Sequence, residues 1–194
     1  APYLKSSNSH AFAKELHGHL IRTQKHSDPF AISDVIKFYS LFSLNKALLV
    51  FNQTERPSLS IWNYIIRGLS KNDRPIEALQ AYDKMRQKGF SGNNLTFIFI
   101  FRVCVQLSDI VLGRAVHVNV VKRGYQYYLY VCNALVYMYG FCGDLTSARK
   151  LFDEMSERDL VTWNSLICGY SQGNRYHEVL DLFGSMQAEN VKAD

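Results

Sequence analysis

The chain resembles itself at an offset of 101 residues, and this internal repeat restricts its possible folds more than any other feature. The offset aligns Trp62, Asn63, Ile66, Gly68, Ser70, Arg74, Glu77, Leu79 and Met85 with Trp163, Asn164, Ile167, Gly169, Ser171, Arg175, Glu178, Leu180 and Met186. So many identities at one offset indicate an array of related units rather than a single irregular domain.

A shorter period lies within this repeat. Mostly apolar residues recur with the i, i+3, i+4, i+7 spacing of one buried helix face. The six stripes are Ala13/Leu16/His17/Leu20, Ala47/Val50/Phe51/Thr54, Ala78/Ala81/Tyr82/Met85, Gly113/Val116/His117/Val120, Ala148/Leu151/Phe152/Met155 and Val179/Leu182/Phe183/Met186. Their first residues are 34, 31, 35, 35 and 31 positions apart. Each stripe predicts a helix, and the interval between helices is not constant.

A second apolar segment precedes each of the last five stripes and is long enough for about three helical turns. These segments are Ile32–Phe42, Ile61–Ser70, Phe97–Leu107, Val131–Phe141 and Thr162–Ser171. Polar or glycine-containing turns separate the partners, as at residues 71–73, 142–144 and 172–174. The predicted unit is a helix–turn–helix pair. Because one pair cannot bury both of its faces, the pairs must stack into an all-α solenoid with a concave groove.

Composition restricts the partners of such an array. The formal net charge of +5 and the pI of about 9.0 favour a polyanion such as nucleic acid. The four cysteines form no C-x-x-C pair, so we expect small buried thiols and neither a metal site nor a cofactor. No run of about 18 apolar residues occurs, so we expect no membrane span. The chain begins Ala-Pro-Tyr rather than with Met, so we expect a fragment or processed form whose lack of a targeting peptide is uninformative.

The repeats resemble a known family. Residues 159–170, Asp-Leu-Val-Thr-Trp-Asn-Ser-Leu-Ile-Cys-Gly-Tyr, followed by Glu178-Val-Leu-Asp-Leu-Phe and Met186, resemble a pentatricopeptide repeat. The resemblance divides the chain into a partial long repeat (10–27), then short (28–57), standard (58–92), long (93–127), short (128–158) and standard (159–194) repeats. This alternation resembles the PLS subclass of plant organellar proteins. Tetratricopeptide repeats are the nearest alternative, but their W-x-x-L-G-x-x-Y pattern is absent and their period is a constant 34 residues.

The resemblance implies a right-handed superhelical solenoid that binds single-stranded RNA, one unpaired base per repeat. In the family, a residue early in the first helix and the last residue before the next first helix together choose the base. The implied pairs are Asn63 with Asn93, Asn133 with Asp159, and Asn164 with Asp194. The family pattern implies uracil for Asn with Asp, and cytosine or any pyrimidine for Asn with Asn.

The chemistry of these side chains agrees with that role. An Asn amide presents one acceptor and two donors, which match a pyrimidine edge, and a nearby carboxylate accepts only and so orients the amide. Tyr130 and Val161 lie where the family packs apolar groups against base faces, and such stacking contributes about 1–3 kcal/mol per base.

Two repeats depart from the pattern. Ile98 with Tyr128 cannot reproduce a polar pair, and the first short repeat offers Ser33 with Ser58 or Pro57. The expected target is therefore a purine followed by Y-N-U-U, bound weakly by so few repeats.

Other interpretations of the same residues remain open. An Asn early in a helix often serves as a cap or a local backbone partner. Basic side chains either contact phosphates, making binding salt-sensitive, or lie on solvated outer faces; they are Lys37, Arg67, Lys71, Arg102, Lys122, Arg123, Arg149, Lys150 and Arg175. His17 and His117 lie on apolar stripes at equivalent positions, which favours packing over catalysis.

Two functions compete. The first is an RNA-binding module that specifies a site for C-to-U editing, or otherwise for RNA processing, in a plastid or mitochondrion. Neither a hydrolase motif nor the H-x-E…P-C-x-x-C deaminase pattern occurs, so we expect no enzyme activity in this chain. The alternative is a protein-interaction scaffold that binds accessory factors, for example through Ile98, Phe99, Phe101 and residues 125–130. Apolar end surfaces of a solenoid also allow self-association.

Overall fold

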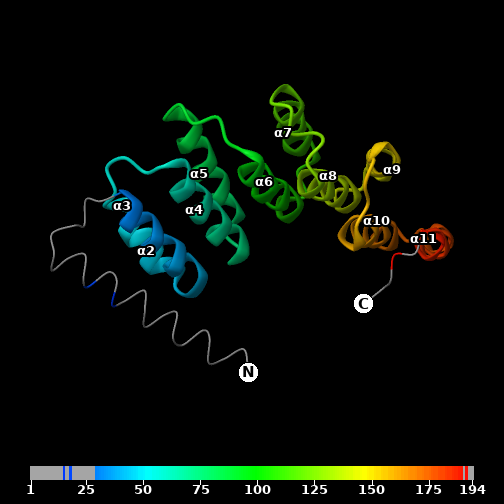
Figure 1. Cartoon of the computed structure of the whole chain (residues 1–194), viewed down its shortest axis with the longest axis horizontal. Helices are drawn as coiled ribbons and strands as arrows, with labels where there is room; N and C mark the ends of the chain where they lie inside the picture. Colours follow the sequence, from blue (N-terminus) through cyan, green and yellow to red (C-terminus); the bar gives the residue numbers. More distant parts are fainter. Residues whose placement is uncertain (1–14, 16–17, 19–28, 190, 192–194) are drawn as a thin grey trace. The chain divides into compact units, whose positions relative to one another are not determined.

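The computed structural model describes residues 15, 18, 29–189 and 191. Helices joined in pairs by short turns make up this part of the chain (Figure 1). Within these residues the structure contains helices and no strand, so the all-α prediction is confirmed. The helices are α2 (Pro29–Phe42), α3 (Leu44–Asn52), α4 (Leu59–Lys71), α5 (Pro75–Gln87), α6 (Asn94–Leu107), α7 (Ile110–Lys122), α8 (Leu129–Phe141), α9 (Leu145–Glu154), α10 (Leu160–Gln172) and α11 (Tyr176–Ala188). The predicted partial repeat at 10–27 and its stripe lie outside the described residues.

The chain divides into two units that meet in sequence between Gly92 and Asn93. In the first unit α2 packs on α3 and on α4, and α4 packs on α5. In the second unit α8 lies between α6 and α10, and α7, α9 and α11 each pack against the first helix of their own pair (Figure 1). In each unit the first helices of successive pairs therefore form one layer, and the second helices cover it.

The tight turn within most pairs has one recurring backbone geometry. Asp73, Ser108, Gly143 and Asn174 take a positive φ one or two residues after the end of the first helix. The next residue then donates its backbone N–H to a carbonyl five positions earlier, as from Asp144 to Tyr139 at 2.9 Å. This bond satisfies a helix-end carbonyl. The same residue occupies the N-cap position of the second helix, so only two or three residues separate the two helices.

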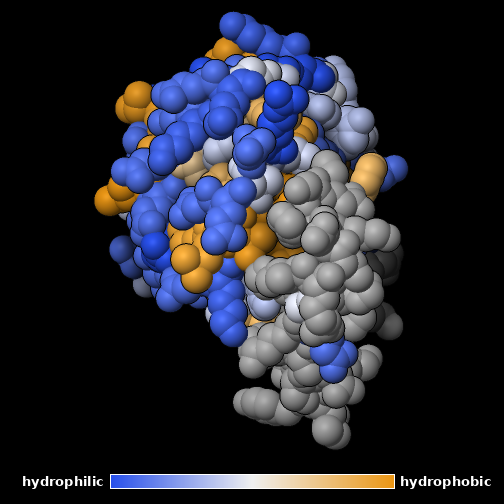
Figure 2. Space-filling model, turned by 90° about the vertical axis from the view of Figure 1, so that its left-hand side faces the viewer, coloured by the Kyte–Doolittle hydropathy of each residue, from blue (hydrophilic) through white to orange (hydrophobic). Residues whose placement is uncertain are grey.

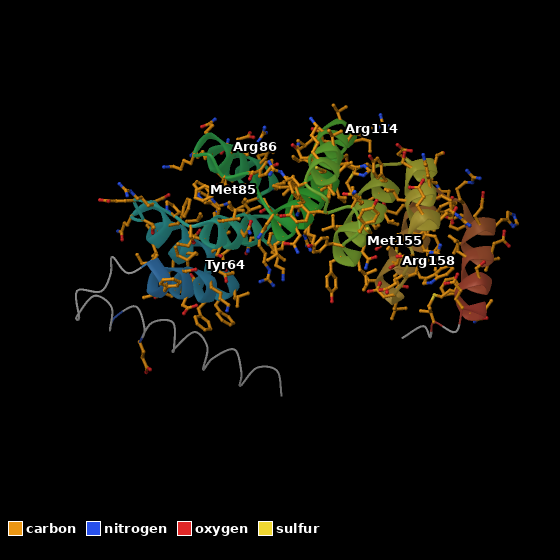
Figure 3. The ribbon with its side chains drawn as sticks, turned by 45° about the horizontal axis from the view of Figure 1, so that its top comes forward. Tyr64, Met85, Arg86, Arg114, Met155 and Arg158 are labelled. Carbon is orange, nitrogen blue, oxygen red and sulfur yellow. The ribbon has the colours of Figure 1, made fainter. Side chains whose placement is uncertain are left out.

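Aromatic pairs join one repeat to the next. Phe51 of α3 meets Trp62 of α4 edge-on at a centroid distance of 4.8 Å, and Phe152 of α9 meets Trp163 of α10 in the same way at 4.7 Å. The two pairs stand 101 residues apart, so the sequence repeat is a packing repeat. Arg158 adds a second layer, with its guanidinium 4.8 Å from the Phe152 ring centroid and a bond to the Phe152 carbonyl (Figure 3).

The last helix keeps an uncovered apolar stripe. Tyr176, Leu180 and Phe183 are exposed on α11, whereas Phe152, at the equivalent position of α9, is buried against Trp163. This stripe is the surface on which self-association of the chain would depend, and self-association stays a prediction. Figure 2 shows the side of the molecule that is drawn at the left of Figure 1. There the described surface is mainly hydrophilic, with small separate hydrophobic groups. Among the described helices, none combines the length and apolarity that a bilayer crossing requires.

His117 packs as predicted, between α7 and α8. Its Nδ1 lies 3.0 Å from the Tyr139 hydroxyl, and the two rings meet edge-on. Burial lowers the pKa of His117 below the usual 6.5, because the protonated ring loses hydration. His17, its counterpart in the sequence repeat, lies outside the described residues.

The stability of the chain is expected to decrease as the pH falls below about 6.5. A histidine with a lowered folded-state pKa contributes stability that is complete above the unfolded pKa and is lost as pH falls through the folded pKa. His117→Asn should therefore reduce the difference between urea-unfolding midpoints at pH 7 and pH 5. The exposed His177, changed to Asn, is the matched control, and an equal reduction in both variants would contradict the assignment to His117.

Candidate nucleic-acid interface

An exposed apolar position recurs at the start of the first helices. The second residue of each is Phe30, Ser60, Leu95, Tyr130 or Val161, and all five are exposed. Phe30 is 85% exposed, Tyr130 73% and Val161 56%. The sequence analysis named Tyr130 and Val161 but missed Phe30 and Leu95. Aligning the helix starts, which the capping residues mark, would have found them.

Basic side chains follow on the same face of these helices. The ninth residue is Lys37 in α2, Arg67 in α4 and Arg102 in α6, seven positions after the exposed second residue. Seven residues are about two helical turns, so both positions share one side of the helix. Lys37 and Arg102 are exposed and Arg67 is half-buried. Helices α2 and α6 therefore present an apolar group and, two turns later, a cation, whereas α4 presents Ser60 and then Arg67.

Three other basic residues are paired within their own helices. Arg149 bonds Asp153, Lys150 lies 3.9 Å from Glu154, and Arg175 bonds Glu178. All three lie on or next to second helices, away from the face just described. They fit the solvated-surface interpretation better than a phosphate-binding one.

The fifth residue of the first helix is the predicted base-selecting asparagine. Asn63, Asn133 and Asn164 occupy this position in α4, α8 and α10. None starts its helix, so none is an N-cap. Asn63 and Asn133 are only 4% exposed, whereas Asn164 is exposed, because no described first helix packs beyond α10. A base can therefore reach Asn164 freely but meets only a small edge of Asn63 or Asn133.

Asn133 belongs to a polar cluster with the next repeat. Its Nδ2 donates to Asp159 Oδ1 at 3.0 Å, and the Thr162 hydroxyl donates to Asn133 Oδ1 at 2.6 Å. Burial raises the pKa of Asp159, but hydrogen bonds from Thr162 and Asn133 outweigh burial and hold it below its usual value. The carboxylate is therefore ionised at neutral pH and only accepts. These bonds leave one Nδ2 hydrogen and one Oδ1 lone pair of Asn133 unused.

Helix capping falls on the second member of the two predicted pairs whose second member the structure describes. Asn93 accepts from Thr96 N at 3.1 Å and Asp159 from Thr162 N at 2.8 Å. In both cases the threonine hydroxyl accepts from the capping residue's own N–H, which completes a capping box. The competing capping interpretation thus holds for Asn93 and Asp159, and for neither Asn63, Asn133 nor Asn164.

The other predicted pairs are only partly defined. Asn63 lies in the first unit and Asn93 in the second, and each unit is described by itself. Asp194 lies outside the described residues. Ser58 is the N-cap of α4 and accepts from Ile61 N at 3.4 Å, while Ile98 of α6 is half-buried.

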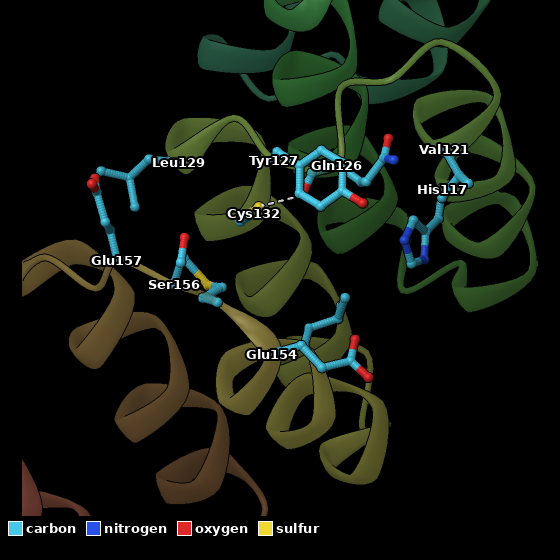
Figure 4. A pocket seen from close by; sticks show the side chains of 11 residues that line it. His117, Val121, Gln126, Tyr127, Leu129, Cys132, Glu154, Ser156 and Glu157 are labelled. Carbon is cyan, nitrogen blue, oxygen red and sulfur yellow. Dashed lines mark hydrogen bonds between the residues drawn. The ribbon is translucent and has the colours of Figure 1, made fainter.

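A cavity of about 540 Å³ lies away from the first-helix face, between α7, α9 and the start of α8 (Figure 4). His117 and Cys132 line it, and Cys132 Sγ donates to the Gln126 carbonyl at 3.0 Å. Glu154 and Glu157 place carboxylates at its other side. Two carboxylates oppose phosphate binding, so this cavity is distinct in chemistry from the face formed by the first helices.

Family models match most of the helical pairs. One described as "PPR repeat family" matches residues 57–106, and one described as "PPR repeat" matches residues 130–160 and 161–191. The chain belongs to the pentatricopeptide repeat family.

Individual relatives agree with this assignment. Pentatricopeptide repeat-containing protein At2g36730 of Arabidopsis thaliana is 32% identical over 189 residues, covering 95% of this chain and 37% of that protein. The chloroplastic/mitochondrial protein At1g59720 of the same plant is 38% identical over 180 residues, covering 90% of this chain and 28% of that protein. The chain thus spans about a third of the length of these curated relatives.

The fold also matches a solved structure. The crystal structure of the pentatricopeptide repeat protein PPR10 in complex with an 18-nt psaJ RNA element superimposes with a TM-score of 0.78. The match covers 95% of this chain and 28% of PPR10 at 18% identity, a level that shows a common fold.

Proposed function

We propose that this chain is a single-stranded RNA-binding module that uses the exposed face of its first helices, with one repeat addressing one base. The observation that carries the proposal is the bonded pair of Asn133 and Asp159, with exposed Tyr130 and Val161 at the starts of the same two helices. Membership of a family in which PPR10 is described in complex with RNA supports it.

Each part of this face has a separate task. Tyr130 and Val161 stack on base faces, and Phe30 and Leu95 occupy the equivalent positions in other repeats. The unused Nδ2 hydrogen and Oδ1 lone pair of Asn133 form hydrogen bonds to the edge of a pyrimidine. Lys37, Arg67 and Arg102 neutralise phosphates, so binding weakens as salt rises.

The expected target is a purine followed by Y-N-U-U. Asn63 with Asn93 accepts a pyrimidine, Ile98 with Tyr128 makes little choice, and the last two repeats select uracil. The starts of α4, α6, α8 and α10 support the repeat boundaries of the PLS interpretation. This chain would specify a site for RNA editing or processing without itself being the catalyst, and the names of its relatives suggest a plastid or mitochondrion as the compartment.

Replacing both Asn133 and Asn164 by alanine is expected to weaken binding of a uridine-ending short RNA by about 10- to 100-fold, since each substitution removes neutral hydrogen bonds worth about 2- to 12-fold. Fluorescence anisotropy at low salt, with the complete chain and a labelled strand, measures the change. Asn164→Ala is the cleaner single variant, because Asn164 is exposed and its truncation leaves no buried group unpaired.

The matched control is Asn119→Ala on α7. Asn119 bonds only the Ala115 carbonyl of its own helix and is expected to leave RNA affinity unchanged. Equal affinity of the wild type and the double variant, with both folded by circular dichroism, would remove the proposed base selection.

Protein binding is the second candidate function, and one observation favours it. Tyr127 is 86% exposed beside the cavity of Figure 4, where a basic apolar peptide would meet Glu154 and Glu157. The prediction that Phe101 contacts a partner protein is wrong, because this side chain is fully buried in α6. A stable complex with a partner protein that survives in a Tyr127→Ala variant would count against this surface.

A further inference from the structure

Thr162 is a buried polar side chain that contacts both members of the Asn133–Asp159 pair. It is fully buried in the first turn of α10. Its Oγ1 lies 2.6 Å from Asn133 Oδ1 and 2.8 Å from Asp159 Oδ1. We propose that Thr162 is a positioning residue that holds the Asn133 amide in one orientation and thereby sets the preference of this repeat for uracil over cytosine. The inference rests on the proposed base selection by Asn133.

The contact distances fix the amide orientation. Neither Asn133 Oδ1 nor the ionised Asp159 carboxylate carries a hydrogen, so the single hydroxyl hydrogen of Thr162 serves two acceptors, and the shorter contact is the one to Asn133 Oδ1 at 2.6 Å. A flipped amide would direct its oxygen at the Asp159 carboxylate at about the same distance, which is repulsive. Nδ2 therefore faces Asp159 and Oδ1 faces Thr162.

The orientation matters because uracil and cytosine differ at N3. Uracil donates from N3–H to an acceptor, whereas cytosine accepts at N3 from a donor. When the Asn133 amide is held in one orientation, its acceptor Oδ1 faces the same atom position of every base that binds. A free amide could rotate and accept either pyrimidine. Asp159 and Thr162 hold opposite ends of the amide, so losing either one weakens the choice.

The test compares two RNAs that differ only by U or C at the nucleotide addressed by the 128–158 repeat. Thr162→Val keeps the shape but removes the hydroxyl, and should reduce the ratio of affinities for U and C by about 2- to 12-fold, the value of one neutral hydrogen bond. Thr162→Ser keeps the hydroxyl and should retain the ratio.

Thr96→Val is the matched control for lost capping. Thr96 is fully buried and makes the same capping box in α6, but it lies in the 93–127 repeat, which precedes the repeat that addresses the tested nucleotide. It should lower stability as Thr162→Val does and leave the ratio at this nucleotide unchanged. A ratio lost equally in Thr96→Val would mean that capping, not amide orientation, is responsible, and would overturn the inference.

Failure of the inference and of the proposed function can be told apart. If the wild type prefers uracil and Asn133→Ala loses that preference while Thr162→Val keeps it, the role of Thr162 is wrong and base selection stands. If neither the wild type nor Asn133→Ala distinguishes the two RNAs, base selection itself fails. Without RNA, hydrogen exchange of the Asn133 side-chain amide by NMR should be faster in Thr162→Val than in Thr162→Ser, and equal rates would also overturn the inference.

Discussion

Replacing Trp163 by alanine is expected to lower the free energy of unfolding by about 3–5 kcal/mol, the usual cost of truncating a large buried aromatic side chain. Trp163 is buried at the start of α10 and meets Phe152 of the preceding repeat edge-on. The substitution leaves a cavity between two repeats. It also removes an aromatic pair worth about 0.5–1.5 kcal/mol beyond its buried area. Urea unfolding followed by circular dichroism measures the loss.

Trp163→Phe is the matched variant. The indole N–H of Trp163 is buried and has no hydrogen-bond acceptor in the structure, so phenylalanine keeps the edge contact and gives up no bond. It should therefore cost much less than alanine. A loss of less than about 1 kcal/mol in Trp163→Ala would contradict a packing role for this residue between repeats.

Replacing Gly169 by valine is expected to cost about 1–3 kcal/mol through overpacking. A Cβ at Gly169 would lie 2.8 Å from Gly140 Cα and 3.2 Å from its carbonyl carbon. Both atoms belong to the backbone of α8, so neither can move aside as a flexible side chain would. The neighbouring helices α8 and α10 would have to separate, and the bonds between Asn133, Asp159 and Thr162 would lengthen with them.

Gly184→Ala provides the control. Gly184 lies in the middle of α11, and a Cβ there would meet nothing within 4 Å. Alanine should stabilise this helix by up to about 1 kcal/mol, because it has the higher helix propensity. Thermal unfolding of both variants is the measurement. Equal effects of the two substitutions would show that the approach of α8 to α10 does not require glycine.

The sequence predicted the helical pairs well and their first turns poorly. The predicted segments Ile61–Ser70 and Val131–Phe141 each begin two residues inside the helices α4 and α8. Apolar periodicity reports only buried residues, and the first two residues of each of these helices are half-buried or exposed. The second helices of the short repeats end early, so that Thr54 and Met155 of the predicted stripes lie just beyond α3 and α9.

The candidate site shows a similar division. The contact between Asn133 and Asp159 was expected from the repeat pattern, and the structure has it at 3.0 Å. The role of Thr162 could not be predicted from the sequence. A threonine three residues after an aspartate indicates a cap, but it does not show which other groups its hydroxyl contacts. The low exposure of the Asn133 side chain could not be predicted from the sequence either, because it depends on how the next repeat packs.

The capping boxes at Asn93 and Asp159 have a consequence for redesign of the array. The predicted base-selecting residue that precedes a first helix also caps that helix at Asn93 and Asp159, and only Asp, Asn, Ser, Thr and, less well, Gly cap effectively. A new nucleotide preference can be engineered at these two positions without loss of the cap only within that short set. An arginine or leucine placed there would alter the anchoring of a neighbouring helix before it altered any contact with RNA.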